Sequence, residues 1–115
     1  MNLDTWRHPE AMSDAGTRAR QFDDLPGDVG GLAKVLHGLL IHERMPDFYG
    51  VRLSSRQREE PHARGAREIL GRIAAHDARP LAEARPPGER FAGCCRHYTL
   101  MHVAMLRNRG IAARA

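Results

Sequence analysis

The strongest constraint on the fold is an amphipathic stretch near the end of the chain. Its apolar residues recur with the spacing of one helical face, and they are Tyr98, Met101, Met105 and Leu106. Gly110 follows at the position where a glycine commonly ends a helix. The pattern therefore predicts a helix over about 95–109 with one face buried against the rest of the domain.

Two earlier stretches have the same period and predict two more helices. The first begins near Asp28 and continues until Pro46 ends the helical pattern. The second covers about 63–76. Their apolar positions are Val29, Leu32, Leu36, Leu39 and Leu40 in the first helix, and Ala66, Ile69, Leu70 and Ile73 in the second.

The segments between these helices lack a long helical period. Residues 46–53 predict an irregular connection packed by its own aromatic residues. Ser54 or Ser55 is suited to cap a short helix over 55–60. A loop is predicted over 77–90, because that stretch holds Pro80, Pro86, Pro87 and Gly88.

Composition favours a small helical domain. The 115 residues suffice for one domain with one modest core. Aromatic residues make up only 5% of the chain, so the core must rest on Leu, Ile, Val, Met and Ala, a set more typical of helices than of strands. We predict a mainly α domain over 22–115. A flexible tail is predicted over 1–21, in which Trp6 is the one residue suited to dock on the domain.

Charge and hydropathy argue against several classes of partner. The net charge is +4, but the arginines are spread along the chain among Asp and Glu, whereas nucleic-acid binders usually cluster them on one face. No apolar run is long enough to span a bilayer, and the N-terminus lacks the apolar core of a secretory signal. We therefore predict a cytoplasmic protein without a nucleic-acid or membrane partner.

The two cysteines, Cys94 and Cys95, are adjacent. Neighbouring Cα atoms lie about 3.8 Å apart, less than the roughly 4.4–6.8 Å of ordinary disulfides, so free thiols in a reducing compartment are expected. A thiol at a helix N-terminus faces free N–H groups that stabilise a thiolate, and Arg96 adds positive charge nearby. On composition alone, however, a cysteine in a short chain is more often a small buried apolar residue.

The segment 90–115 resembles the nucleophile region of the transglutaminase-like superfamily. The family pattern is a Gly, a variable residue, the catalytic Cys, and a helix that ends in Arg and Gly before an Ile-x-Ala-Arg strand. The matching residues are Gly93, Cys95, Arg107, Gly110, Ile111, Ala113 and Arg114. His97 and Ala112 stand where family members often carry Asp and Pro. Residues 22–90 resemble the helical lead-in of bacterial members more weakly.

The resemblance implies both a fold and a site. The chain would form the helical N-terminal half of an α+β, papain-like (cysteine proteinase) fold and stop at the start of the first core strand, near Ile111. Cys95 would be the nucleophile for acyl transfer or for hydrolysis of a protein, peptide or amide substrate, without cofactor or metal. The family's basic His and orienting Asp lie on later strands, so this truncated chain is expected to be inactive.

None of the histidines present is expected to replace that base. His97 is two residues from Cys95 and points to another side of the helix. His102 shares the face of Cys95 but lies about 10 Å along the helix axis. Four others would need tertiary packing to approach Cys95, and we interpret them as surface or core residues: His37, His42, His62 and His76.

Three other functions stay open. A non-catalytic helical remnant or protein-interaction module would expose an apolar face and an unpaired strand edge at 111–115, which favours self-association. A metal site could draw on Cys94, Cys95, His97 and His102 but lacks the Cys-x-x-Cys spacing of a zinc site. Nucleic-acid binding rests on charge alone.

Overall fold

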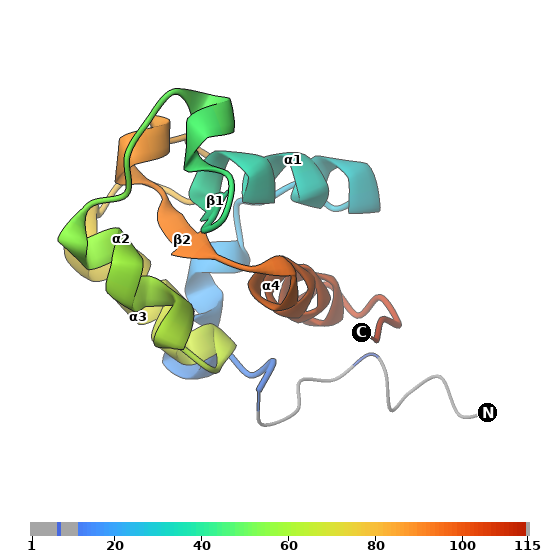
Figure 1. Cartoon of the computed structure of the whole chain (residues 1–115). Coiled ribbons are helices and arrows are strands. Elements are labelled where there is room, and N and C mark those ends of the chain that lie inside the picture. Colours follow the sequence, from blue (N-terminus) through green and yellow to red (C-terminus); the bar gives the residue numbers. More distant parts are fainter. Residues whose placement is uncertain (1–6, 8–11, 115) are drawn as a thin grey trace.

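The computed structural model describes residue 7 and residues 12–114. Helices make up most of this described part, and they surround a two-stranded parallel sheet, so a mainly α chain is confirmed (Figure 1). The helices and strands are η2 (Gly16–Phe22), α1 (Val29–Leu39), β1 (Leu40–His42), η3 (Pro46–Tyr49), α2 (Ser55–Glu59), η4 (Glu60–His62), α3 (Ala66–His76), η5 (Pro87–Glu89), β2 (Phe91–Gly93) and α4 (Cys95–Asn108). The η elements are short 3-10 helices.

The sheet lies between α1 and α4 on one side and α2 and α3 on the other (Figure 1). β1 follows α1 directly, whereas β2 comes after α2, α3 and a long loop. The two strands pair Leu40 with Phe91, Ile41 with Ala92, and His42 with Gly93. Because the strands are parallel, the residues after His42 and after Gly93 leave the sheet at the same end.

Most of the core comes from the apolar stripes that the sequence predicts, although Val29, at the start of α1, is 52% exposed. α1 packs against α4, and α3 packs against both α4 and β2. The central side chains are almost completely excluded from solvent: Leu32, Leu39, Ile69, Leu70, Met101 and Met105, with Phe22 and Phe91. Each such side chain stabilises the fold by about 1.5–3 kcal/mol relative to an exposed one.

Local caps fix the ends of these helices where the sequence predicts them. The Asp28 carboxylate accepts the Gly31 N–H at 2.9 Å and begins α1. Ser54 and Gln57 form a reciprocal capping box that begins α2. Gly110 adopts φ 75° after α4, a left-handed conformation that a glycine reaches without strain.

The first long helix ends earlier than predicted. α1 stops at Leu39, and Leu40–His42 is a strand. Two tertiary contacts account for the change. The Arg85 N–H donates to the carbonyl of Gly38, and the loop crosses α1 so closely that a Cβ at Gly38 would lie 2.9 Å from that of Ala84. Pairing with β2 then satisfies the backbone of the next residues as a strand.

A strand was also expected to begin at Ile111, and the described residues 111–114 do not form one. The Ile111 N–H donates to the carbonyl of Leu106, and the Arg107 Nε donates to the carbonyl of Ala113 at 2.9 Å. The segment therefore folds back on α4, and no open strand edge is formed there. Ala115 lies outside the described residues.

The predicted flexible tail over 1–21 falls only partly on the described residues. Trp6 lies outside them. The last part of the predicted tail is ordered, because Gly16–Phe22 forms η2 and packs on α3 and α4. The Arg109 guanidinium fixes the end of η2 by donating to the carbonyls of Phe22, Asp23 and Leu25.

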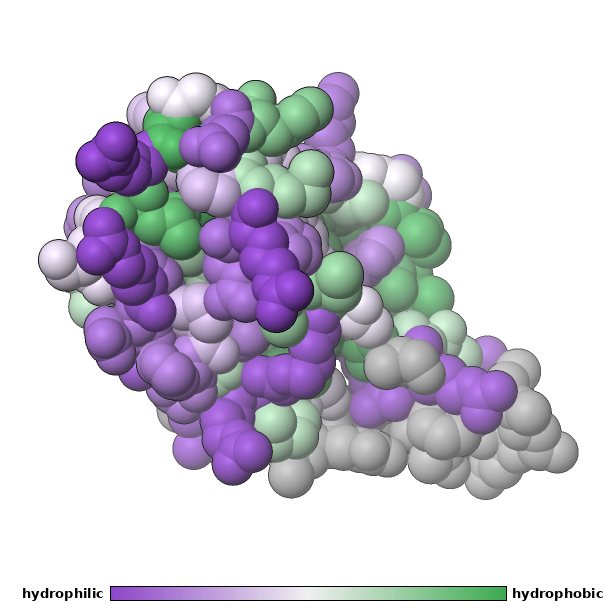
Figure 2. All heavy atoms as spheres, viewed as in Figure 1, coloured by the Kyte–Doolittle hydropathy of each residue, from purple (hydrophilic) through white to green (hydrophobic). Residues whose placement is uncertain are grey.

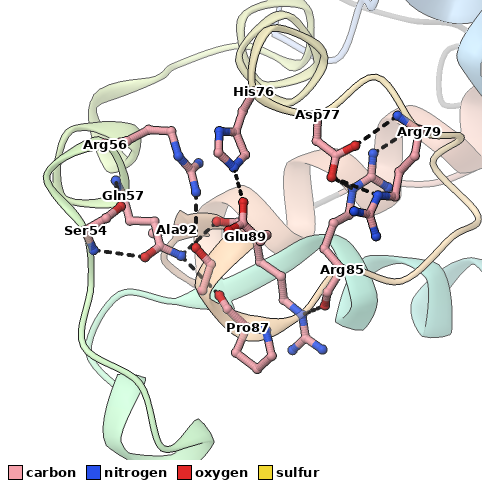
Figure 3. A network of polar contacts seen from close by, with 12 residues as sticks. Ser54, Arg56, Gln57, His76, Asp77, Arg79, Arg85, Pro87, Glu89 and Ala92 are labelled. Carbon is pink, nitrogen blue, oxygen red and sulfur yellow. Dashed lines mark hydrogen bonds and ion pairs between the residues drawn. The ribbon is translucent and has the colours of Figure 1, made fainter.

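Side chains close the free edge of β2 (Figure 3). Glu60 accepts the Ala92 N–H at 3.0 Å, and the Gln57 amide donates to the carbonyls of Pro87 and Arg90. Both side chains are almost completely buried. They occupy the backbone groups that a third strand would use, so this edge is not open to another chain.

Candidate active site

Cys95 is the first residue of α4, and its thiol is exposed. The Sγ atom lies 3.6 Å from Nε2 of His42, within hydrogen-bond range for sulfur. The sequence did not predict this contact, since the two residues are 53 positions apart. A nucleophilic thiol next to a histidine is the arrangement on which thiol-dependent acyl transfer depends.

The parallel sheet brings these two residues together. His42 is the last residue of β1 and is paired with Gly93, the last residue of β2. The Glu43 N–H donates to the carbonyl of Gly93 at 2.8 Å and continues the ladder. Cys95 follows only two residues after Gly93, so the helix N-terminus begins beside the His42 ring.

Backbone contacts determine which ring nitrogen of His42 carries the proton. Nδ1 accepts the Arg44 N–H at 3.2 Å and so cannot also hold a hydrogen on the same lone pair. In the neutral ring the hydrogen is therefore on Nε2, which faces Cys95 Sγ. Nε2–H is a donor to the sulfur, which stabilises a thiolate and does not remove a proton from a thiol.

Cys94 has a histidine partner of its own. His97 is 1% exposed, and its Nε2–H donates to the carbonyl of Ala63 at 2.9 Å. Its Nδ1 accepts the Cys94 N–H at 3.0 Å and lies 3.4 Å from Cys94 Sγ. The Cys94 sulfur thus lies beside a ring nitrogen that already accepts the Cys94 N–H, and not beside a ring N–H. This pair closes the N-terminus of α4 and is structural.

Gly93 makes room for the His97 ring. A Cβ at Gly93 would lie 2.8 Å from the Cβ and 2.9 Å from the Cγ of His97. Real side chains do not tolerate contacts this short, so the residue before the two cysteines must be small. The Gly-x-Cys spacing that the sequence presents therefore has a packing cause in this chain.

Arg96 does not direct its charge at Cys95. Its guanidinium donates to the carbonyls of Ala63 and Arg64 and lies beside the buried ring of His97. The positive environment of Cys95 comes instead from the N–H groups of α4 and from the His42 ring.

An aromatic surface adjoins the thiol. Burial raises the pKa of Tyr98 to about 12, with smaller contributions from the neighbouring Tyr49 phenol and Cys95 thiol, against the opposing Arg90. The Arg90 guanidinium lies 5.5 Å from the centre of the Tyr49 ring. Tyr49 in turn packs edge-to-face against Phe48, with ring centres 5.1 Å apart.

A buried carboxylate supports β2 through the Ala92 N–H (Figure 3). Glu60 is 2% exposed, and Arg56 Nη1 lies 2.6 Å from its other oxygen. Burial raises the pKa of Glu60 above its ordinary value, although the Ala92 N–H and Arg56 oppose the shift. His76 and Glu89 form a second pair beside it at 2.5 Å.

The long loop before β2 is organised by a buried arginine (Figure 3). Arg85 donates to the carbonyls of Arg79, Pro80 and Glu83, and burial lowers its pKa. Hydrogen bonds from the Arg79 backbone N–H and side chain lower the pKa of Asp77. These contacts hold the loop against α1 and so position β2 next to β1.

Apart from His62, the other histidines of the described residues have partners other than Cys95. His102 Nε2 contacts the carbonyl of Val29 at 3.3 Å, the His37 ring packs near Tyr98, and His76 pairs with Glu89. His62 is exposed at the end of η4. Among the described residues, no group of three His, Cys, Asp or Glu side chains is placed to hold a metal ion.

Sequence reasoning missed His42 because no local spacing links it to Cys95. The available signal was weak and lay in two short apolar runs, Leu40-Ile41 and Phe91-Ala92, each followed by a residue of the site. Only their pairing as strands brings His42 to the thiol.

Comparisons with protein-family models, with curated proteins and with solved structures find no match for this chain. In the described part of the chain, no helix is both long and apolar enough to cross a membrane.

Proposed function

We propose that Cys95 is a thiol nucleophile that accepts acyl groups, in a domain of the transglutaminase-like, papain-like type. One observation carries the proposal: the exposed Sγ lies at the N-terminus of a 14-residue helix, 3.6 Å from Nε2 of His42. The N–H groups of the helix and of His42 stabilise the thiolate. They also stabilise the oxyanion that forms when the thiolate attacks a carbonyl.

The hydrogen-bond pattern of His42 defines which acyl donors can react. Attack forms the thioester C–S bond and breaks the bond to the leaving group, which must depart with a proton if it is an amine. In neutral His42, Nε2 carries the hydrogen and Nδ1 accepts the Arg44 N–H, so neither ring nitrogen is free to take up a further proton. Activated esters, whose leaving groups depart as anions, should therefore acylate Cys95, and amides should not.

The same pattern predicts that the thioester accumulates. Hydrolysis needs a base that takes a proton from water, and His42 does not supply one in this tautomer. We expect one equivalent of acyl group per chain, without turnover.

The test uses 4-nitrophenyl acetate and follows release of 4-nitrophenolate. The wild-type chain should show a burst of one equivalent, and intact mass should increase by one acetyl group on Cys95. Cys95→Ser should lose the burst, whereas Cys94→Ser, the matched control, should retain it. An equal burst from Cys95→Ser would show that Cys95 is not the nucleophile.

A further inference from the structure

Beside the proposed nucleophile lies a set of aromatic side chains and one guanidinium, that of Arg90, which has no carboxylate partner among the described residues. Tyr98 is three residues after Cys95 and therefore lies on the same side of α4. Tyr49, Arg90 and Cys95 are near enough to Tyr98 for their charges to affect its pKa. Tyr49 itself packs on Phe48 and lies under the Arg90 guanidinium. We call Phe48, Tyr49, Arg90 and Tyr98 the aromatic–arginine surface.

Phe48 is the most exposed large apolar side chain of the described residues, at 76%. It lies in η3, in the connection between β1 and α2, and hydrophobic residues reach the surface there near the top of the view (Figure 2). Met45, one residue before η3, is also exposed at 49%. Two large apolar groups on one short connection are a candidate docking point for an apolar residue.

Arg90 supplies the charge of this surface. Its Nε donates to the carbonyl of Arg85 at 2.8 Å, which fixes the side chain. Its guanidinium lies over Tyr49, and among the described residues no carboxylate pairs with it. The two Nη groups stay available for a carboxylate, for which a guanidinium is the preferred planar partner.

The charges around η3 are mixed. Arg44 and Arg52 flank η3 on either side and are exposed, whereas Asp47 lies within η3 and Glu43 precedes Arg44. The whole chain carries a net charge of +4. A ligand of this surface should be acidic because Arg90, which has no carboxylate partner among the described residues, attracts a carboxylate and repels a basic group.

We propose that the aromatic–arginine surface binds the acyl donor of Cys95, an acidic peptide segment that carries its acyl group as an activated ester. An apolar residue of this peptide packs on Phe48 and Tyr49, and a carboxylate pairs with Arg90. The inference rests on the proposed function, since it names the substrate class of the same thiol. An anchored peptide places its reactive carbon at Cys95 for longer than a free small molecule can.

The experiment compares two alkylating peptides, chloroacetyl-Gly-Phe-Glu-amide and chloroacetyl-Gly-Phe-Gln-amide. In both, the thiolate forms a C–S bond at the CH2 group and chloride leaves. Labelling of Cys95 should saturate with peptide concentration. The Glu peptide should bind about tenfold more tightly than the Gln peptide, as expected for one charge-assisted pair. The ratio should fall as salt is raised.

Variants separate the two contacts. Arg90→Gln should reduce the Glu-to-Gln ratio to about one, Arg90→Lys should preserve part of it, and Arg58→Gln, on exposed α2 surface, should leave it unchanged. Phe48→Ala should weaken both peptides equally and keep the ratio. A wild-type ratio of about one, or one that Arg90→Gln does not change, would overturn the inference.

Chloroacetamide lacks both anchoring groups and therefore tests the reactivity of Cys95 without the aromatic–arginine surface. It distinguishes a failure of the docking inference from a failure of the proposed nucleophile. If chloroacetamide labels Cys95 and the peptides show no preference, the docking inference fails and the nucleophile stands. If none of the three reagents labels Cys95, both proposals fail.

Discussion

The two cysteine–histidine pairs at the start of α4 contain the same groups and differ in which edge of the ring meets the sulfur. In both, a backbone N–H donates to Nδ1, from Cys94 to His97 and from Arg44 to His42. Both rings therefore carry hydrogen on Nε2. Cys94 Sγ approaches Nδ1 of its partner, whereas Cys95 Sγ approaches Nε2.

This difference gives the two thiols different surroundings. Cys94 Sγ lies beside Nδ1, which already accepts the Cys94 N–H, in a pair whose ring is buried against Ala63. Cys95 is exposed, and its Sγ faces the donor edge of the His42 ring. Adjacent residues of one type thus meet opposite edges of an imidazole ring.

The largest expected effect tests the buried pair. His97→Ala should lower the free energy of unfolding by about 3 kcal/mol, because it leaves the Cys94 N–H and the Ala63 carbonyl without partners and opens a cavity. His42→Ala should cost less than about 1 kcal/mol, since its ring is half-buried. Urea unfolding of both variants measures the difference. Equal losses would remove the distinction between a structural and a chemical pair.

The next effect concerns the space that the buried ring requires. Gly93→Ala should destabilise the fold by about 2 kcal/mol, because the new methyl group overlaps His97. Gly88→Ala is the matched control, since a Cβ there meets nothing within 4 Å. Thermal and urea unfolding should separate the two variants. If Gly93→Ala is as stable as Gly88→Ala, His97 is not held as described.

The sequence could predict the α-helices of this chain, most of their buried faces and some of their ends. The periodicity of α1, α3 and α4 predicts most of their buried faces, Ser54 marks the start of α2, and Gly110 marks the end of α4. These features depend on neighbours along the chain, which the sequence displays.

The missed features depend on contacts between distant segments. The change at Leu40 from helix to strand requires β2, and the contact of His42 with Cys95 requires the register of that pairing. At Ile111 the resemblance predicts a strand, but Arg107 draws the segment back onto α4. Three-residue strands carry too little alternation to be predicted locally.

A smaller effect is expected for the exposed pair of Cys95 and His42. Iodoacetamide should alkylate Cys95 faster than Cys94, and His42→Leu should slow Cys95 about fivefold, the value of one hydrogen bond of about 1 kcal/mol. The rate at Cys94 should not change. Mass spectrometry of digested samples reads both sites in one experiment. A faster Cys95 in His42→Leu would mean that the ring shields the sulfur and does not stabilise its charge.

The smallest expected effect concerns Glu60, which supports β2, the strand that precedes both cysteines. Burial raises the folded-state pKa of Glu60 above its ordinary value of 4.5. The stability that this shift contributes is fully present below pH 4.5 and is lost as the pH rises through the folded-state pKa.

Glu60→Gln keeps an acceptor for the Ala92 N–H but cannot ionise, so its stability should lack this dependence. The difference in the free energy of unfolding between wild type and variant, measured by urea unfolding at several pH values, should shift against the wild type as the pH rises. The labelling ratio of Cys95 to Cys94 should stay constant across the same variants, because Glu60 supports β2 as a whole and contacts neither sulfur. A changed ratio would show that the two pairs are coupled through β2, and the contrast between them would then depend on the strand as well as on the two rings.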